Sequence, residues 1–235
     1  MDIEKEKTAN GIVMPHDFPI EKYNEIQQYI RKYSTLKETE WMLFGVAWNG
    51  VCYRFRAMAE HDEKFILSMT KPQPHFHEDL YIQANELFEF FYCGVSTIDC
   101  LNFSIYSIAS LIDIITFPVM DAEELNFNRF RVERKFNTSF TGDTLSLSLS
   151  KIINDPMCKR FYDYRNVLSH RGILNRKIDT YDDKITIPIN PKESSHMWEY
   201  NFTMDENTTS SYRQWLSLEL THFLDNVDIF CKSKL

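Results

Sequence analysis

Long apolar runs at helical spacing dominate the chain, and they predict an all-α protein. Residues 19–32 are predicted to form a helix, and we interpret the first 18 residues as an N-terminal arm. Thr35 followed by Glu38 has the pattern of a capping box, in which a hydroxyl and a carboxylate satisfy free amides at a helix start. The sequence therefore predicts a long helix from there to about Ala59, or on to Met69.

A second long helix is predicted after the prolines of residues 71–74, because proline disfavours helical geometry in the residues before it. From about His77 to Ile115 the pattern is amphipathic at first and then apolar almost all round. Such a pattern is typical of a central bundle helix or of a helix shared with a second subunit. Asp99 and Asp113 argue against a membrane span.

The next segment gives weaker signals. Residues 117–143 are polar and predicted to be irregular. LSLSLSKII, residues 145–153, alternates as a strand does, yet Leu145, Leu149 and Ile152 also share a helical face. We favour a short helix. Asp155 and Pro156 then supply an N-cap and a first-turn proline.

The helix that begins at Pro156 is predicted to cover about 16 residues, because Gly172 suits the position just after a helix end. Two short β-branched or aromatic segments follow and predict a hairpin insertion over residues 184–202. Residues 210–231 are apolar at helical spacing and are expected to dock back on the bundle. The simplest organisation is one helical domain over residues 19–235.

Charge is unevenly distributed along the chain. The net charge of -8 argues against broad adhesion to nucleic acid or anionic membranes. Residues 129–177, however, hold 11 Lys and Arg against 4 Asp and Glu, a local net charge of +7. This basic region marks where an anion would bind, although a solvated basic face would give the same count.

Other compositional features narrow the class of protein. The N-terminus has no basic-then-apolar signal pattern, and no run reaches the roughly 18 apolar residues of a membrane helix, so a cytoplasmic protein without a membrane partner is expected. The five cysteines are scattered without a CxxC pair and are interpreted as reduced, mostly buried thiols. No glycine-rich phosphate loop is present, and no cofactor is predicted.

The basic region contains the stretch DYRNVLSHRG, residues 163–172. At about 100° per residue, Met157, Phe161, Tyr164 and Leu168 form one stripe, which we predict faces the core. Asp163, Asn166 and His170 form a second stripe on roughly the opposite side. A helix end also favours nearby cations, which alone would account for His170 and Arg171.

The residue types of this stretch suit chemistry on RNA. RNA supplies its own nucleophile, the 2′-hydroxyl, so cleavage needs a base, an acid and a cation for the crowded phosphorane. His170 can transfer protons near neutral pH, and Arg165 offers a planar fork that matches phosphate oxygens. No metal is required. One chain supplies one histidine here, so a twofold homodimer would provide both proton-transfer groups.

Arg165, Asn166 and His170 also match a known signature, because this segment resembles the Rx4-6H motif of the HEPN superfamily. The resemblance implies an antiparallel helical bundle and a metal-independent endoribonuclease that acts as a homodimer, often in toxin–antitoxin or other defence systems, with Arg165 and His170 catalytic and Asn166 supporting. Members paired with a nucleotidyltransferase often carry tyrosine where this chain has Gly172, which argues against that kind of antitoxin partner.

The first functional hypothesis is therefore a dimeric endoribonuclease in which Arg171, Lys159 and Arg160 help to hold the RNA backbone. The alternative is a non-catalytic HEPN-like module that binds a nucleotide, RNA or a protein partner through the same surface. A third reading is a structural dimer whose motif merely ends a helix.

Two further clusters contain residue types that bind metals or nucleic acid. His75 and His77, with His61 and Glu78 nearby, hint at a metal, but no third ligand has a diagnostic spacing, and no metal site is predicted. Residues 126–136 combine aromatic and basic side chains as single-strand binders do. An amphipathic strand or loop that packs its phenylalanines inward is the favoured interpretation of that segment.

Overall fold

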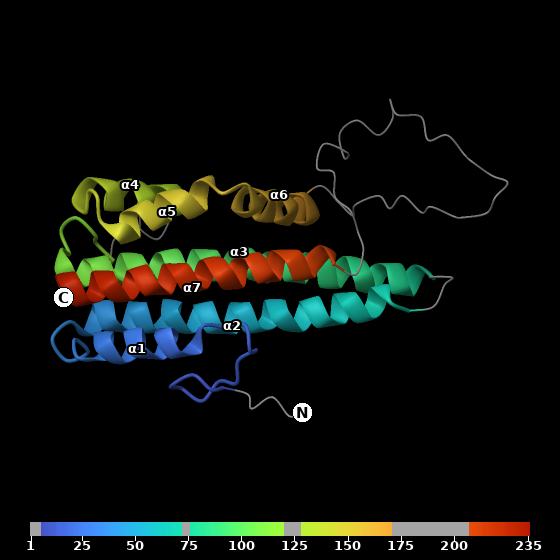
Figure 1. Ribbon diagram of the computed structural model, residues 1–235, viewed down its shortest axis with the longest axis horizontal. Helices are drawn as coiled ribbons and strands as arrows, with labels where there is room; N and C mark the ends of the chain where they lie inside the picture. Colours follow the sequence, from blue (N-terminus) through green and yellow to red (C-terminus); the bar gives the residue numbers. More distant parts are fainter. Residues whose placement is uncertain (1–5, 72–75, 120–127, 171–206) are drawn as a thin grey trace.

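The computed structural model describes residues 6–71, 76–119, 128–170 and 207–235 (Figure 1). The helices in these ranges are α1 (Ile20–Arg31), α2 (Glu38–Met69), α3 (His77–Ile112), α4 (Arg129–Ser139), α5 (Thr144–Asn154), α6 (Pro156–His170) and α7 (Thr208–Lys234). The described part of the chain contains no strand, only an isolated bridge between Lys7 and Val13. The all-α class is confirmed. The predicted hairpin over residues 184–202 and Gly172 lie outside the described residues.

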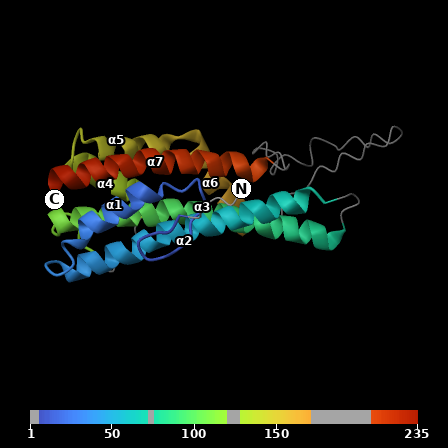
Figure 2. The same ribbon diagram turned by 60° about the horizontal axis from the view of Figure 1, so that its bottom comes forward.

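The two longest helices, α2 and α3, form an antiparallel pair that projects beyond the other helices (Figures 1 and 2). Helix α7 packs against this pair and also contacts α1 and α5. Helices α4, α5 and α6 follow one another along the other side, where α6 packs on α3. Helix α6, which contains Arg165, Asn166 and His170 and which we call the motif helix, is thus supported by α3, the longest of the described helices.

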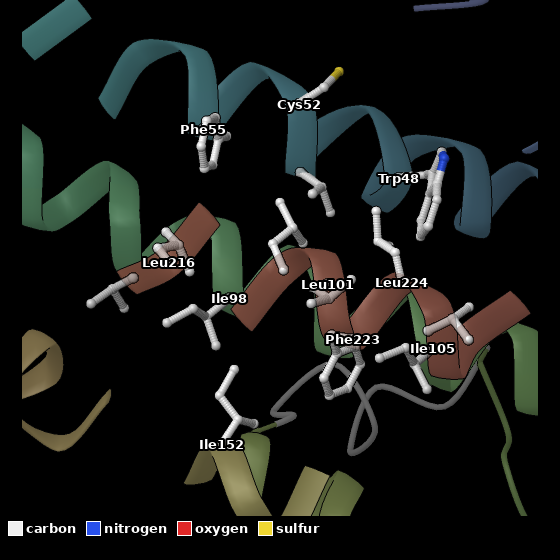
Figure 3. Close-up of a cluster of buried hydrophobic side chains, with 14 of the residues drawn as sticks. Trp48, Cys52, Phe55, Ile98, Leu101, Ile105, Ile152, Leu216, Phe223 and Leu224 are labelled. Carbon is white, nitrogen blue, oxygen red and sulfur yellow. The ribbon is translucent and has the colours of Figure 1, made fainter. Parts of the chain in front are cut away.

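Large apolar side chains fill the space between α2, α3 and α7 (Figure 3). Trp48 and Phe55 of α2, Ile105 of α3 and Leu224 of α7 are fully buried, and Ile152 of α5 closes the cluster from the other side. The five cysteines are free thiols, four of them buried, as expected from the sequence. Burial removes a large apolar area from water, which is the main stabilisation of such a bundle.

Glycine permits close approach at two helix contacts. A side-chain carbon at Gly50 of α2 would lie 2.7 Å from the sulfur of Cys100 on α3. A side-chain carbon at Gly94 of α3 would overlap the ring of Phe161 on α6 and meet the sulfur of Met58 at 3.1 Å. Gly94 therefore sets how closely the motif helix approaches α3.

The predicted start of the long second helix is wrong in detail. Lys37 is the N-cap of α2 and makes no capping hydrogen bond through its side chain. The amides of Leu36 and Lys37 instead donate to the carbonyl oxygen of Tyr33. Because this backbone turn satisfies the amides before α2, the capping box of Thr35 and Glu38 does not form. Of the two predicted ends of this helix, about Ala59 and Met69, the structure has the second.

The prediction that residues 117–143 are irregular is wrong, because α4 lies within them. The side chain of Asn128 accepts a hydrogen bond from the amide of Arg131 and so caps this helix. Val132 and Phe136 are its buried residues, and Lys135 donates to the carbonyl oxygen of Thr116 at 2.9 Å. Because only these two residues form the apolar stripe of α4, the sequence shows little of the hydrophobic periodicity that would predict a helix here.

The remaining predicted helices are confirmed, with ends that shift by a few residues. Within the described part of the N-terminal arm, Met14 and Phe18 are buried, so this segment contributes to the core. Helix α3 is long and apolar enough to cross a membrane, and 72% of its most apolar window is buried inside the fold. Its place in the core is sufficient to account for that composition.

Candidate functional site

The motif helix α6 is fixed at its start and along its inner face. Asp155 accepts a hydrogen bond from the amide of Met157 at 2.7 Å, and Pro156 is the first helical residue, as predicted. The rings of Phe161 and Tyr164 are buried against Phe91 of α3, with centroids 5.4 and 5.2 Å away. The predicted core face is confirmed, and this packing fixes the direction in which the polar residues of α6 point.

The outward residues are also placed as predicted, where the structure describes them. Asp163 and Asn166 are exposed, and Arg165 is partly buried. His170 is the last residue of α6, but its side chain, like the whole of Arg171, lies outside the described residues. The geometry between Arg165 and His170 therefore stays a prediction.

Arg165 shares its surroundings with a second arginine from another helix. The Cζ atom of Arg165 lies 5.8 Å from the ring centroid of Tyr162, one turn earlier on α6. Arg129, the first residue of α4, lies closer, with its Cζ atom 3.3 Å from the same centroid. A guanidinium over an aromatic ring is attracted by the negative face of the ring. Two permanent positive charges therefore lie around the ring of Tyr162. We call Arg129, Tyr162 and Arg165 the arginine–tyrosine cluster.

Asp99 of α3 lies at the edge of this cluster. The hydroxyl of Tyr162 donates a hydrogen bond of 2.7 Å to Oδ1 of Asp99. Desolvation raises the pKa of Asp99, although the Tyr162 hydrogen bond and the charges of Arg165 and Arg129 pull it down. Desolvation also raises the pKa of Tyr162, and the charge of Asp99 adds to that shift. Tyr162 is therefore a neutral hydrogen-bond donor at physiological pH.

The two guanidinium groups have unused donors. Nε and Nη1 of Arg129 and Nε of Arg165 are buried and have no hydrogen-bond partner. Within the ranges that the structure describes, neither arginine forms an ion pair with a carboxylate. A buried donor without a partner costs free energy, so such groups usually have an ordered partner. These atoms are closed off from solvent, so an anion with several oxygens, such as a phosphate, would satisfy them only after the arginine side chains turn outward.

The other predicted backbone-binding residues do not join this cluster. Lys159 and Arg160 are both exposed on α6. Arg160 interacts with Tyr212 of α7 and lowers the pKa of that phenol, whose burial raises it. On a helix, Arg160 and Tyr162 point in roughly opposite directions, about 160° apart. Arg160 thus lies on the α7 side of the motif helix, away from Arg129.

Arg129, Tyr162 and Asp99 were not predicted as site residues. Arg129 belongs to the aromatic and basic segment of residues 126–136, for which the sequence favours an amphipathic strand or loop that packs its phenylalanines inward. That segment forms the start of α4, in which Phe136 is buried and Phe130 is half exposed. Asp99 offered one signal, because it is a charged residue within the apolar second half of α3.

A cleft of about 710 Å³ lies elsewhere, between the N-terminal arm, α2 and α7. Its central charge is Arg213, which donates to both carboxylate oxygens of Asp17 and to Asp62. These ion pairs occupy the guanidinium, so the lining of the cleft, as far as the structure describes it, offers no free cation comparable with Arg129. We interpret these ion pairs as the contact that attaches the N-terminal arm to α7.

No protein-family model, curated protein or solved structure matches this chain. The resemblance to the HEPN superfamily therefore depends on the motif in α6, and the site is interpreted from its own chemistry.

Proposed function

We propose that this protein is a metal-independent endoribonuclease of the HEPN type that acts as a homodimer. One observation carries the proposal: the guanidinium groups of the motif residue Arg165 and of Arg129 lie around the same ring, that of Tyr162, so two permanent positive charges stand close together. Guanidinium groups are planar, permanently charged and matched to phosphate oxygens. The arginine–tyrosine cluster then binds the scissile phosphate or the one beside it.

The proposed reaction is an internal transesterification. The 2′-hydroxyl gives its proton to a base and its oxygen attacks the adjacent phosphorus, while the bond to the 5′-oxygen breaks and that oxygen takes a proton from an acid. The products are a 2′,3′-cyclic phosphate and a 5′-hydroxyl. His170 from each subunit supplies proton transfer, Arg165 stabilises the phosphorane, and the exposed Asn166 positions the substrate.

The test is cleavage of an unstructured, end-labelled RNA in EDTA by the wild-type chain and by His170→Ala and Arg165→Ala. We expect losses of about 100-fold or more for each variant, as is typical for a proton-transfer group and for a donor to transition-state charge. Arg134→Ala, an exposed arginine on α4, is the matched control and is expected to cleave normally. Cleavage that survives both motif substitutions would overturn the assignment.

A site shared by two subunits predicts that the cleavage activity depends on protein concentration, which the same assay can measure. If two chains complete one site, the activity per chain falls when the protein is diluted below its dimer dissociation constant. Mixing His170→Ala with Arg165→Ala chains tests whether the two subunits share one site. Activity per chain that is independent of dilution would contradict a shared site.

A second candidate function is non-catalytic RNA or nucleotide binding by the same surface. The close stacking of Arg129 on Tyr162 favours it, because both groups bind substrate without needing to transfer protons. Under this function His170→Ala leaves RNA affinity nearly unchanged, and Arg165→Glu weakens it in a salt-dependent way. Binding without cleavage by the wild-type chain would select this candidate over the first.

A further inference from the structure

A second group of reactive side chains lies between α2 and α3 and has no part in the proposed RNA site. His61 of α2 meets Glu89 and Cys93 of α3, and one ligand atom from each lies within 4.8 Å of the others. Glu89 and Cys93 are four residues apart, so they lie on one face of α3. His61 and Glu89 are partly buried, and Cys93 is buried.

A fourth residue orients the histidine. Nδ1 of His61 lies 2.6 Å from Oε2 of Glu86, and only 20% and 14% of these two side chains are exposed. A carboxylate at Nδ1 favours the tautomer that carries its proton there, which leaves the lone pair of Nε2 available. Histidines that bind metals usually make such a hydrogen bond through the second ring nitrogen. The pairing with Glu86 therefore prepares His61 to act as a ligand.

We propose that His61, Glu89 and Cys93 form a binding site for a divalent transition-metal ion, with zinc as the best-matched ion. The donor set is one nitrogen, one oxygen and one sulfur, which suits zinc. It does not suit magnesium or calcium, because these ions prefer oxygen ligands alone. In a tetrahedral zinc site, bonds of about 2.0–2.3 Å place the ligand atoms roughly 3.5 Å apart. Small side-chain rotations close the present spacing, and a fourth coordination position stays open.

The charges around the cluster favour a divalent cation. Glu89 and Arg54, which carry opposite charges, both lie near the Cys93 thiol. A cysteine binds a metal ion as the thiolate. Glu86, Glu89 and the Cys93 thiolate then carry three negative charges. A divalent ion together with Arg54 balances them.

The site joins α2 to α3 across their antiparallel contact, so a bound ion would stabilise the folded chain by mass action. This role is structural and independent of the RNA chemistry. The proposed ribonuclease is tested in EDTA at a temperature at which the metal-free chain is folded by circular dichroism, whereas the metal site is tested without RNA, so the failure of one proposal is distinguishable from the failure of the other.

The experiment is a cobalt titration of untagged protein that has first been freed of metal. We expect one Co²⁺ per chain, with a thiolate-to-cobalt absorption band in the near ultraviolet and visible bands of tetrahedral intensity. Cys93→Ser removes the thiolate band. Cys100→Ser, a partly buried thiol on the same helix outside the cluster, is the matched control and keeps the band.

Zinc competition against Co²⁺ and zinc-dependent thermal unfolding provide the second measurement. Glu86→Gln is expected to weaken zinc binding about 10- to 100-fold, as is usual when a group that orients a ligand is lost, while the thiolate band stays. Glu89→Gln and His61→Asn lower the affinity at least as much, and His222→Asn, an exposed histidine on α7, leaves it unchanged.

Helical circular dichroism of the metal-free variants identifies any that fail to fold, and the conclusion then depends on the remaining variants. The proposal is wrong if the wild-type chain does not bind Co²⁺ stoichiometrically. It is equally wrong if the thiolate band persists in folded Cys93→Ser. It is also wrong if folded His61→Asn and Glu89→Gln bind zinc with the same affinity as the wild-type chain.

Discussion

The Cζ atom of Arg129 lies 3.3 Å from the ring centroid of Tyr162, so the first residue of α4 is held against the middle of the motif helix α6. This contact brings a cation from a separate segment to the residue that precedes Arg165 by one turn. The guanidinium of an arginine carries a permanent positive charge. The contact therefore places a second permanent positive charge beside Arg165, and both guanidinium groups lie around the ring of Tyr162.

Arg129→Ala is expected to weaken RNA binding as a phosphate contact does. Affinity should fall about uniformly across RNA sequences, and the slope of log affinity against log salt should become shallower by about 0.7 for a single-stranded ligand. Fluorescence anisotropy over a salt series measures both quantities. Arg134→Ala, from an exposed position on the same helix, is the control. An unchanged salt slope in Arg129→Ala would exclude Arg129 from phosphate binding.

Asp99→Asn is expected to have the opposite effect and to tighten RNA binding. The carboxylate of Asp99 accepts a hydrogen bond from Tyr162 and lies near both arginines, so it repels an incoming phosphate. Asparagine keeps an acceptor for the Tyr162 hydroxyl and removes the charge. Anisotropy at constant ionic strength compares the two chains.

The same residue gives the binding a pH dependence. Desolvation raises the pKa of Asp99 above the usual range of an aspartate in the folded protein. Wild-type affinity should therefore fall as the pH rises through this raised pKa, since the carboxyl becomes charged there. Asp99→Asn should lack that transition. A wild-type profile identical to that of Asp99→Asn would show that Asp99 does not act on the bound phosphate.

The sequence predicted the motif helix well because its signals are local. Asp155 and Pro156 mark the start of α6, and the stripe through Phe161 and Tyr164 marks its buried face. The outward position of Asn166 follows from the same periodicity. These features depend on residues within a few turns of one another, where helical geometry alone fixes the relation between side chains.

The partnership of Arg129 with Arg165 could not be predicted in the same way. It depends on how α3 and α5, which both contact α4 and α6, place these two helices, and α4 itself buries only Val132 and Phe136. A similar limit applies to His61, whose partners Glu89 and Cys93 lie on another helix. Sequence spacing directed attention to His75 and His77 instead, but His77 is exposed at the start of α3 and His75 lies outside the described residues.

Gly94→Ala is expected to destabilise the fold although alanine is the better helix former. The added carbon overlaps the Phe161 ring and meets Met58 at 3.1 Å, and such overpacking costs about 1–3 kcal/mol. The gain in helix propensity, about 1 kcal/mol, offsets only part of this cost. Urea unfolding monitored by circular dichroism measures the net change.

Gly45→Ala is the matched control for that substitution. Gly45 lies within α2, and a side-chain carbon there meets nothing within 4 Å. We therefore expect this variant to gain about 0.5–1 kcal/mol from helix propensity alone. Equal effects of the two substitutions would show that the close contact of α3 with Phe161 does not limit the space at Gly94.

Arg213→Ala is expected to cost far more than the loss of an exposed ion pair. Arg213 donates to both oxygens of Asp17 at 2.8 and 2.9 Å and to Asp62 at 3.0 Å, and only 5% of the Asp62 side chain is exposed. Removing the arginine leaves a buried carboxylate without its counter-charge, which typically costs about 3–5 kcal/mol. Arg56→Ala breaks an exposed pair with Glu60 and should cost about 0.5 kcal/mol or less.

Limited proteolysis distinguishes a local effect of this substitution from a global one. Asp17 belongs to the N-terminal arm, whereas Arg213 belongs to α7, so loss of the ion pair should expose the arm to protease before the helices unfold. Arg213→Lys keeps the charge but loses the bidentate geometry, and we expect an intermediate stability. If Arg213→Ala and Arg56→Ala unfold at the same urea concentration, the ion pair with Asp17 and Asp62 does not hold the arm in place.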